Sequence, residues 1–182
     1  PDGVTYRFHH MMKECAEHTF LTLPHAAQVC CRERLGAWYE EHRQYIQSMS
    51  AYWKSGNYDA ALRVVEKDAG ILLASLNPQT VPNAMAVCPI SDLKAHPLAL
   101  LVLMRSMFNW RNVPKMLELK ELLLTAIREH PELSSAERGN LLGECDLIMS
   151  FLCYNDIGAM SRLHRSASAQ MSRPAISIRK SG

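Results

Sequence analysis

The sequence predicts an all-α protein that is built from antiparallel helical hairpins. From residue 10 onward, apolar residues recur at spacings of three and four, and proline or glycine separates the periodic segments. The 182 residues are 48% hydrophobic and 21% charged, which is typical of a globular chain with one core. The longest unbroken apolar run covers residues 98–104, whereas a membrane span needs roughly 20 residues. We therefore expect no contact with a membrane.

The first expected element is one short strand. Val4, Tyr6 and Phe8 alternate with polar residues after an Asp-Gly turn signal at residues 2–3. A single strand cannot satisfy its own backbone groups, so we expect its partner strands upstream. Because the chain also starts at Pro1 without Met, we expect it to be a segment of a longer protein.

Eight helices are expected after this strand. Pro97 and Pro114 suit the first turn of a helix, where a missing N–H costs nothing, and Ser134 with Glu137 forms a capping box. The run 77–90 contains three prolines and is expected to be one long loop. The predicted helices are His10–Phe20, His25–His42, Tyr45–Ser55, Tyr58–Ser75, Pro97–Trp110, Pro114–His130, Ser135–Tyr154 and Asp156–Met171.

A turn pattern between helices lies at residues 52–62. Gly56 can adopt a positive φ at the end of a helix, Tyr58 can wedge between helices, and Ala61 lets two backbones approach. Weaker copies, in which the Gly and Ala positions are replaced, are Arg43-Gln44-Tyr45 with Ser48, Arg111-Asn112-Val113 with Met116, and Asn155-Asp156-Ile157 with Met160. Their intervals are uneven, unlike the regular tetratricopeptide period of about 34 residues. We therefore expect degenerate, tetratricopeptide-like hairpins in a superhelical array, although any antiparallel helix pair needs a turn and a small residue.

The order of three segments resembles a family of regulators. These segments are Tyr6-Arg7-Phe8-His9, Trp38-Tyr39-Glu40-Glu41-His42 and Ser55-Gly56-Asn57-Tyr58. Together they resemble the junction between the winged-helix and helical-repeat regions of large LuxR-type transcription regulators, STAND ATPases related to the ATP-dependent maltose activator. The resemblance is closest over residues 6–66 and rests on the helical rhythm alone over 98–165. It implies a winged-helix remnant at 1–23, with the expected strand, and a tetratricopeptide-like repeat domain at 24–171. By its charge, the remaining segment 172–182 is a basic tail.

The resemblance also implies which functions this segment has. In that family a P-loop ATPase precedes the winged helix, and a DNA-binding helix-turn-helix follows the sensor. The chain has no G-x-x-x-x-G-K-[ST] motif and no clear terminal helix-turn-helix. We therefore expect no cofactor and no specific DNA binding here, with ATP bound only in the N-terminal part of the parent protein. The implied role is a non-enzymatic sensor segment that binds an effector or partner protein and contacts the parent's other domains; the alternative is an independent protein-interaction scaffold unrelated to transcription.

The candidate contact residues follow from the turn at Gly56. In tetratricopeptide-like hairpins the first helix of each pair lines the concave face. Ile46, Ser50, Trp53 and Lys54 would point to that face and contact the effector or partner. For Trp53 a place in the core between repeats is an equally good interpretation.

The sequence favours neither a zinc site nor a catalytic thiol at the cysteines and histidines. Seven such residues lie within residues 9–31, but only Cys15-x-x-His18 has a familiar zinc spacing, and zinc needs four converging ligands. The adjacent Cys30 and Cys31 lie in an amphipathic helix without the open pocket that a thiolate nucleophile needs. We therefore assign no metal site and no catalytic residue. The six cysteines have no disulfide-framework spacing, which predicts reduced, buried thiols and a cytoplasmic protein.

The charge distribution singles out the C-terminus. Twenty basic and 18 acidic residues give a net charge of +2. Residues 161–182 carry five basic residues and no acidic one. Such arms can contact phosphates, but a solvated terminus is the commoner case.

Overall fold

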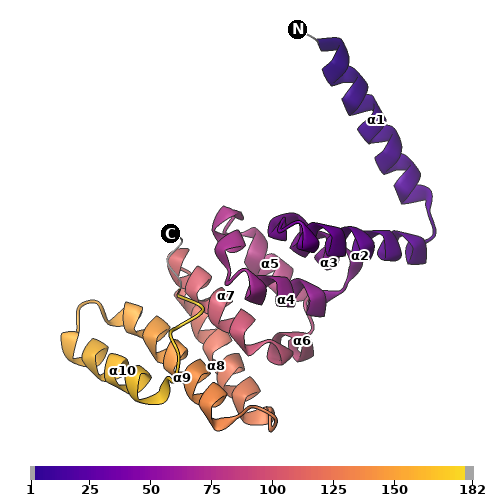
Figure 1. The fold of residues 1–182 in the computed structure, drawn as a ribbon. Helices are drawn as coiled ribbons and strands as arrows, with labels where there is room; N and C mark the ends of the chain where they lie inside the picture. The colour runs from indigo at the N-terminus through magenta and orange to yellow at the C-terminus, as the bar shows by residue number, and fades with distance from the viewer. Residues whose placement is uncertain (1–2, 179–182) are drawn as a thin grey trace. The chain divides into compact units, whose positions relative to one another are not determined.

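The computed structural model describes residues 3–178, and every regular element in this range is helical (Figure 1). The α-helices are α1 Gly3–Thr22, α2 His25–Glu41, α3 Tyr45–Ser55, α4 Tyr58–Lys67, α5 Thr80–Val87, α6 Ile90–Ala95, α7 Pro97–Asn109, α8 Val113–Glu129, α9 Ser135–Ser150 and α10 Ile157–Gln170. Two short 3₁₀ helices, η1 Ile71–Ser75 and η2 Phe151–Cys153, follow α4 and α9. Over residues 3–178, no helix has the length and apolar character needed to cross a membrane.

The chain separates into two compact units, Pro1–Asn57 and Tyr58–Gly182. The first unit contains α1 to α3, and the second contains the remaining helices. The boundary falls at the turn after α3, inside the stretch for which a single repeat domain is expected from the sequence.

The strand expected at the N-terminus is wrong. Val4, Tyr6 and Phe8 lie in α1, which begins at Gly3 and continues to Thr22. A helix satisfies its backbone N–H and C=O groups within the segment, whereas a lone strand needs a neighbour. Apolar residues that alternate over only five positions do not offset the backbone hydrogen bonds that a lone strand would lack.

Five of the eight predicted helices agree with the structure to within one or two residues. The helix expected from His10 begins seven residues earlier, at Gly3, and three further segments need correction. The helix expected over 58–75 breaks at Ala69 and Gly70, whose φ angles are +51° and +75°, so that α4 ends at Lys67 and η1 follows. The helix expected over 135–154 ends as η2. The loop expected over 77–90 instead contains α5 and the start of α6, because Pro82 lies in the first turn of α5 and Pro89 is the N-cap of α6.

Three of the four predicted turns share one backbone geometry. Arg43, Gly56 and Arg111 have φ angles of +58°, +80° and +58°. In each turn the N–H of this residue donates to the carbonyl three residues earlier, and the next N–H donates to the carbonyl five residues earlier, at 2.8 to 3.1 Å. These are Schellman turns, which satisfy the last carbonyls of a helix. At the fourth turn the Asp156 side chain instead accepts from the Ala159 N–H at 2.8 Å and caps α10.

We expect Gly56→Val to lower the free energy of unfolding by at least about 1 kcal/mol, because a β-branched residue is strained at positive φ. No atom lies within 4 Å of the position that a Cβ would occupy at Gly56, so the strain of the backbone dominates the cost. Urea denaturation of the variant and the parent measures the difference. Coincident midpoints would contradict the turn geometry.

In the hairpin of α2 and α3, side chains of α3 pack directly against the backbone of α2 at Gly36. A Cβ at Gly36 would lie 2.8 Å from the Tyr52 ring. Ser48, at the small-residue position of the predicted turn pattern, is fully buried and donates to the Gly36 carbonyl at 2.8 Å. These two residues, with Ala51 and Tyr52, are the buried residues of the described part of this unit.

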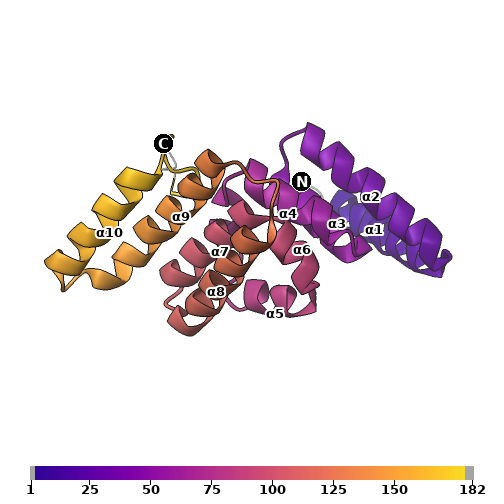
Figure 2. The same ribbon diagram turned by 90° about the horizontal axis from the view of Figure 1, so that it is seen from below.

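The second unit has its core around α7. This helix packs against α4, α8 and α9, and α9 packs against α10; Figure 2 shows the pairs α7–α8 and α9–α10 side by side. Leu100, Met104 and Met107 of α7 are fully buried, and Ala61 of α4 and Met116 of α8, both at predicted turn-pattern positions, are as well. This core positions the cavity and the polar clusters described below.

Candidate functional site

A groove in the first unit is the first candidate site. Side chains from the end of α1, from α2 and from α3 line a depression of about 780 Å³, which we call the α1–α3 groove. Its apolar lining includes Phe20, Leu21, Leu35, Tyr39 and Ile46. Leu21, Leu35 and Ile46 are 65%, 45% and 38% exposed. Clustered apolar side chains of this exposure typically mark a surface that binds another molecule.

Three of the four residues that we predicted as contacts line this groove. Ile46, Ser50 and Lys54 lie one turn apart along α3 and face it together. Trp53 is half-buried and does not line it. The structure therefore brings Ile46, Ser50 and Lys54 together with residues of α1 and α2 that the sequence analysis did not single out.

Arg32 holds the walls of the groove in place. Its guanidinium carbon lies 5.1 Å from the centre of the Phe20 ring on α1, and its Nη1 donates to the Lys54 carbonyl at the end of α3 at 3.0 Å. Gln28 of α2 donates to the Leu23 carbonyl after α1 at 3.0 Å. These contacts link α2 to α1 and to α3, and so they hold the backbone that carries the apolar side chains of the groove.

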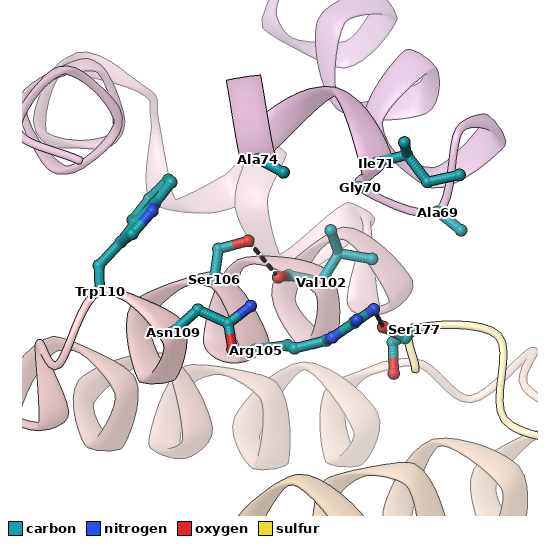
Figure 3. Close-up of a pocket in the computed structure, with 10 residues that line it drawn as sticks. All are labelled: Ala69, Gly70, Ile71, Ala74, Val102, Arg105, Ser106, Asn109, Trp110 and Ser177. Atoms are coloured by element: carbon teal, nitrogen blue, oxygen red, sulfur yellow. Dashed lines mark hydrogen bonds between the residues drawn. The ribbon is translucent and has the colours of Figure 1, made fainter. Parts of the chain in front are cut away.

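The second candidate is a cavity of about 100 Å³ in the second unit, which we call the Arg105 cavity (Figure 3). It lies between the turn at Ala69 and Gly70, η1, α7 and the C-terminal segment. A Cβ at Gly70 would lie 2.0 Å from Val102 Cγ1, so the turn lies directly against α7. Arg105 Nη1 donates to the Ser177 carbonyl at 2.8 Å and closes one side.

The C-terminal segment is anchored by a buried carboxylate. Glu144 of α9 is 0% exposed and accepts hydrogen bonds from Arg173 Nη1 at 2.7 Å and from the Ser177 N–H and hydroxyl at 2.8 and 2.6 Å. Asn140, one turn earlier, accepts from the Ser172 N–H at 2.8 Å. Within the described residues, the basic tail is therefore docked through Arg173, which corrects the interpretation of 172–178 as a solvated arm.

His96 lies between two carboxylates before α7. Its Nδ1 is 3.1 Å from Glu66 Oε2 and its Nε2 is 3.0 Å from Asp59 Oδ1, and Glu66 also accepts from the Ala99 N–H at 3.1 Å. The hydrogen bond with Glu66 raises the pKa of His96, and the bond with Asp59 adds to this effect, while burial opposes it. Both ring nitrogens can donate only in the imidazolium form, so this form links α4 to the start of α7.

We expect the second unit to lose stability as the pH rises above about 6.5. Because the pKa of His96 is raised in the folded state, its contribution is fully present below the unfolded pKa and disappears as the pH passes through the folded pKa. Urea denaturation at a series of pH values measures this loss. His96→Gln should flatten that part of the profile, and an unchanged profile would show that another group titrates there.

The two buried cysteines, Cys88 and Cys145, are not activated nucleophiles. Burial raises the pKa of Cys88 to about 11, with Asp92 adding to the effect, and burial likewise raises the pKa of Cys145 to about 11. All six cysteines are free, but Cys15, Cys30 and Cys31 are exposed, which corrects the expectation of buried thiols at these three positions. In the described part of the chain, no three His, Cys, Asp or Glu side chains gather as metal ligands would. The His9 and His10 side chains lie outside that description.

Comparisons with protein families, with curated proteins and with solved structures find no match for this chain.

Sequence reasoning missed several residues that shape these sites. Arg32 and Phe20 act across two helices, and nothing in their local pattern marks that contact. Arg105 carried a weak signal, since it is a lone charge within a strongly apolar helical stretch, whereas Glu144 is followed by Asp146 and carried none. A charge at such a position is buried only when a partner is present.

Proposed function

We propose that the chain is a non-enzymatic helical-repeat module that binds a partner protein through the α1–α3 groove. The observation that carries the proposal is the exposure of Leu21, Leu35 and Ile46 along one groove whose backbone Arg32 fixes. A rigid apolar surface with a charged rim suits an amphipathic helix of another protein or domain, whose apolar face would cover these side chains. Lys54 at the rim adds a cation for an acidic residue of the partner.

We further propose that this module is the sensor segment of a LuxR-type transcription regulator in the cytoplasm. Support comes from two of the three segments that carry the resemblance: Trp38 to Glu41 lie in α2, and Ser55 to Tyr58 form the Schellman turn between α3 and α4. The third segment, Tyr6 to His9, lies in α1 and adds no support. The recurrence of this turn at Arg43 and Arg111 favours tetratricopeptide-like hairpins in a superhelical array. ATP binding and specific DNA binding would then belong to other parts of the regulator.

An independent helical scaffold without a role in transcription is the second candidate. The same groove would serve it equally well, so the two candidates differ in what surrounds the module. Sequencing the complete gene distinguishes them. A P-loop upstream and a helix-turn-helix downstream are expected for the regulator, and their absence would favour the scaffold.

The docking role is tested with the variant Ile46→Asp in the complete regulator. A charge in the groove should reduce effector-dependent transcription of a reporter by at least about tenfold, because an apolar contact is replaced by a buried charge. Ile157→Asp is the matched control: Ile157 is 80% exposed and lies in the other unit. Equal activity of the Ile46 and Ile157 variants, with unchanged thermal midpoints, would contradict docking at the groove.

A further inference from the structure

We propose that a groove in the second unit binds a basic amphipathic helix of another protein or domain. Side chains of α5, α6 and α8, with Cys88 between the first two, line a depression of about 440 Å³, which we call the Glu121 groove. All of its lining residues belong to the second unit, and none of them lines the α1–α3 groove. The inference therefore goes beyond the proposed function and does not depend on it.

The bottom of the Glu121 groove is apolar and belongs to the core of the unit. Met85, Leu93 and Leu119 line it and are only 5%, 5% and 2% exposed. Ile90 lines it as well, but this side chain is 63% exposed, and Val87, close by in the sequence, is 61% exposed. A partner that covers the exposed apolar side chains would remove their surface from water, which favours binding.

The side of the groove formed by α8 carries an unpaired negative charge. Among the described residues, the charged ones that line the groove are Lys115, Glu118 and Glu121. Lys115 Nζ lies 2.6 Å from Glu118 Oε1, so these two charges offset each other. Within residues 3–178, the Glu121 carboxylate makes no hydrogen bond or ion pair. A cation of a partner can therefore pair with Glu121 without breaking a contact of the chain.

Two charged residues just outside the lining leave the groove acidic. The negative charge of Asp92 in α6 adds to the raised pKa of Cys88, so this charge acts on the same groove. Arg128 lies two turns beyond Glu121 on α8 and donates to the Thr125 hydroxyl at 3.1 Å instead. The unpaired carboxylate of Glu121 therefore has an acidic neighbour and no basic partner.

The lining follows α8 for about three turns. Its residues on this helix lie within 115–125, and ten residues of helix rise about 15 Å. Leu119 and Leu122, three residues apart, lie on the same face of α8, which faces the groove. A partner helix of similar length can place apolar residues, spaced by three and four, against these leucines, with a lysine or arginine beside Glu121.

The sign of the partner's charge distinguishes the two grooves. Among the described residues, Arg32 and Lys54 line the α1–α3 groove with one acid, Glu17, so basic residues outnumber acidic ones there. In the Glu121 groove, two acidic residues are present with one basic residue. The whole chain has a net charge of +2, so its overall charge does not attract a cationic peptide. Binding of such a peptide would therefore report a local acidic site.

The test is a titration of the full chain into a fluorescently labelled peptide of leucine and lysine, about 14 residues long, whose leucines repeat at spacings of three and four. We expect a saturable rise in fluorescence anisotropy. The affinity should fall when NaCl is raised from about 50 to about 500 mM, because salt screens the charge pair. A peptide with serine in place of leucine has the same charge without the apolar face, and it should bind at least about tenfold more weakly.

Two pairs of variants locate the binding in the Glu121 groove. Glu121→Lys should weaken binding of the leucine–lysine peptide at least about fivefold, whereas Glu41→Lys, the same change at an exposed residue of α2, should leave it unchanged. Ile90→Ser should also weaken it at least about fivefold. Its control is Ile157→Ser, at a side chain that is 80% exposed outside the groove, which should leave the affinity unchanged.

Far-UV circular dichroism identifies the variants that keep the fold. No saturable binding up to about 1 mM, equal binding of the serine–lysine peptide, or parental affinity in a folded Glu121→Lys or Ile90→Ser variant would each overturn the proposal. Equal weakening by Glu121→Lys and Glu41→Lys would show attraction by charge alone and would overturn it as well.

Discussion

Glu144→Gln should lower the free energy of unfolding by about 3 kcal/mol, because breaking a buried charged pair leaves its partners without an acceptor. Glu144 is fully buried and accepts from Arg173 and from both the N–H and the hydroxyl of Ser177. A glutamine keeps the shape of the side chain, but it loses the charge and directs an NH₂ group toward these donors. Urea denaturation measures the loss, and hydrogen exchange of the Ser177 amide, which donates to Glu144, should become faster as the segment is released.

The matched control is Glu137→Gln. Glu137 accepts a hydrogen bond from Nη2 of the same Arg173 guanidinium at 3.0 Å. Its side chain, however, is 41% exposed. A partly exposed ion pair contributes less than about 1 kcal/mol. If the two variants were equally destabilised, burial of the carboxylate would not be what anchors the C-terminal segment.

Gly70→Ala should also cost about 3 kcal/mol, because strain and overpacking act together. Gly70 has a φ of +75°, and a Cβ there would lie 2.0 Å from Val102 Cγ1. Thermal and urea denaturation of the variant measure the cost. The NMR signal of Trp110 should shift as well, because Gly70 and Trp110 line the same cavity.

Two variants separate the strain from the clash. Gly56→Ala has a similar φ of +80° with nothing within 4 Å, so it should cost only about 1 kcal/mol. Combining Gly70→Ala with Val102→Ala removes the clash, and the two losses should then sum to more than the loss measured in the double variant. Simple additivity would show that Val102 does not limit the space at Gly70.

The turns were predictable because their chemistry is local. The pattern at Gly56 located the turns at Arg43 and Arg111 even though arginine replaces glycine there, and all three residues have a positive φ in the structure. The turns at Arg43 and Arg111 were identified by the residues at the start of the next helix, which have the same spacing as those after Gly56. Local hydrogen bonds within six residues decide such a turn, so a short sequence window contains the information.

The errors arose where distant contacts or a missing neighbour decide the structure. Residues 4–8 alternate like a strand but lie in α1, and the described residues contain no strand that could pair with them. The break after α4 is an exception, because it is a local turn: the Ala69 N–H donates to the Glu66 carbonyl at 3.0 Å and the Gly70 N–H donates to the Val65 carbonyl at 3.1 Å. The docked tail depends on Glu144, which is 29 residues from Arg173. In the α1–α3 groove, Ile46, Ser50 and Lys54 followed from the helix period, whereas Arg32 and Phe20 required the tertiary fold.

The anchored C-terminal segment has a practical consequence for anyone who trims this chain. Cutting before Ser172 would remove Arg173 and Ser177 and leave Glu144 buried without the donors that it has here. A buried carboxylate without donors is costly, so the shortened protein would lose stability or admit water into the helix pair. A boundary placed after residue 178 keeps Arg173 and Ser177 on the carboxylate. The useful limit of this unit is therefore set by the contacts of Glu144, the farthest of which is made by Ser177, seven residues beyond the end of the last helix at Gln170.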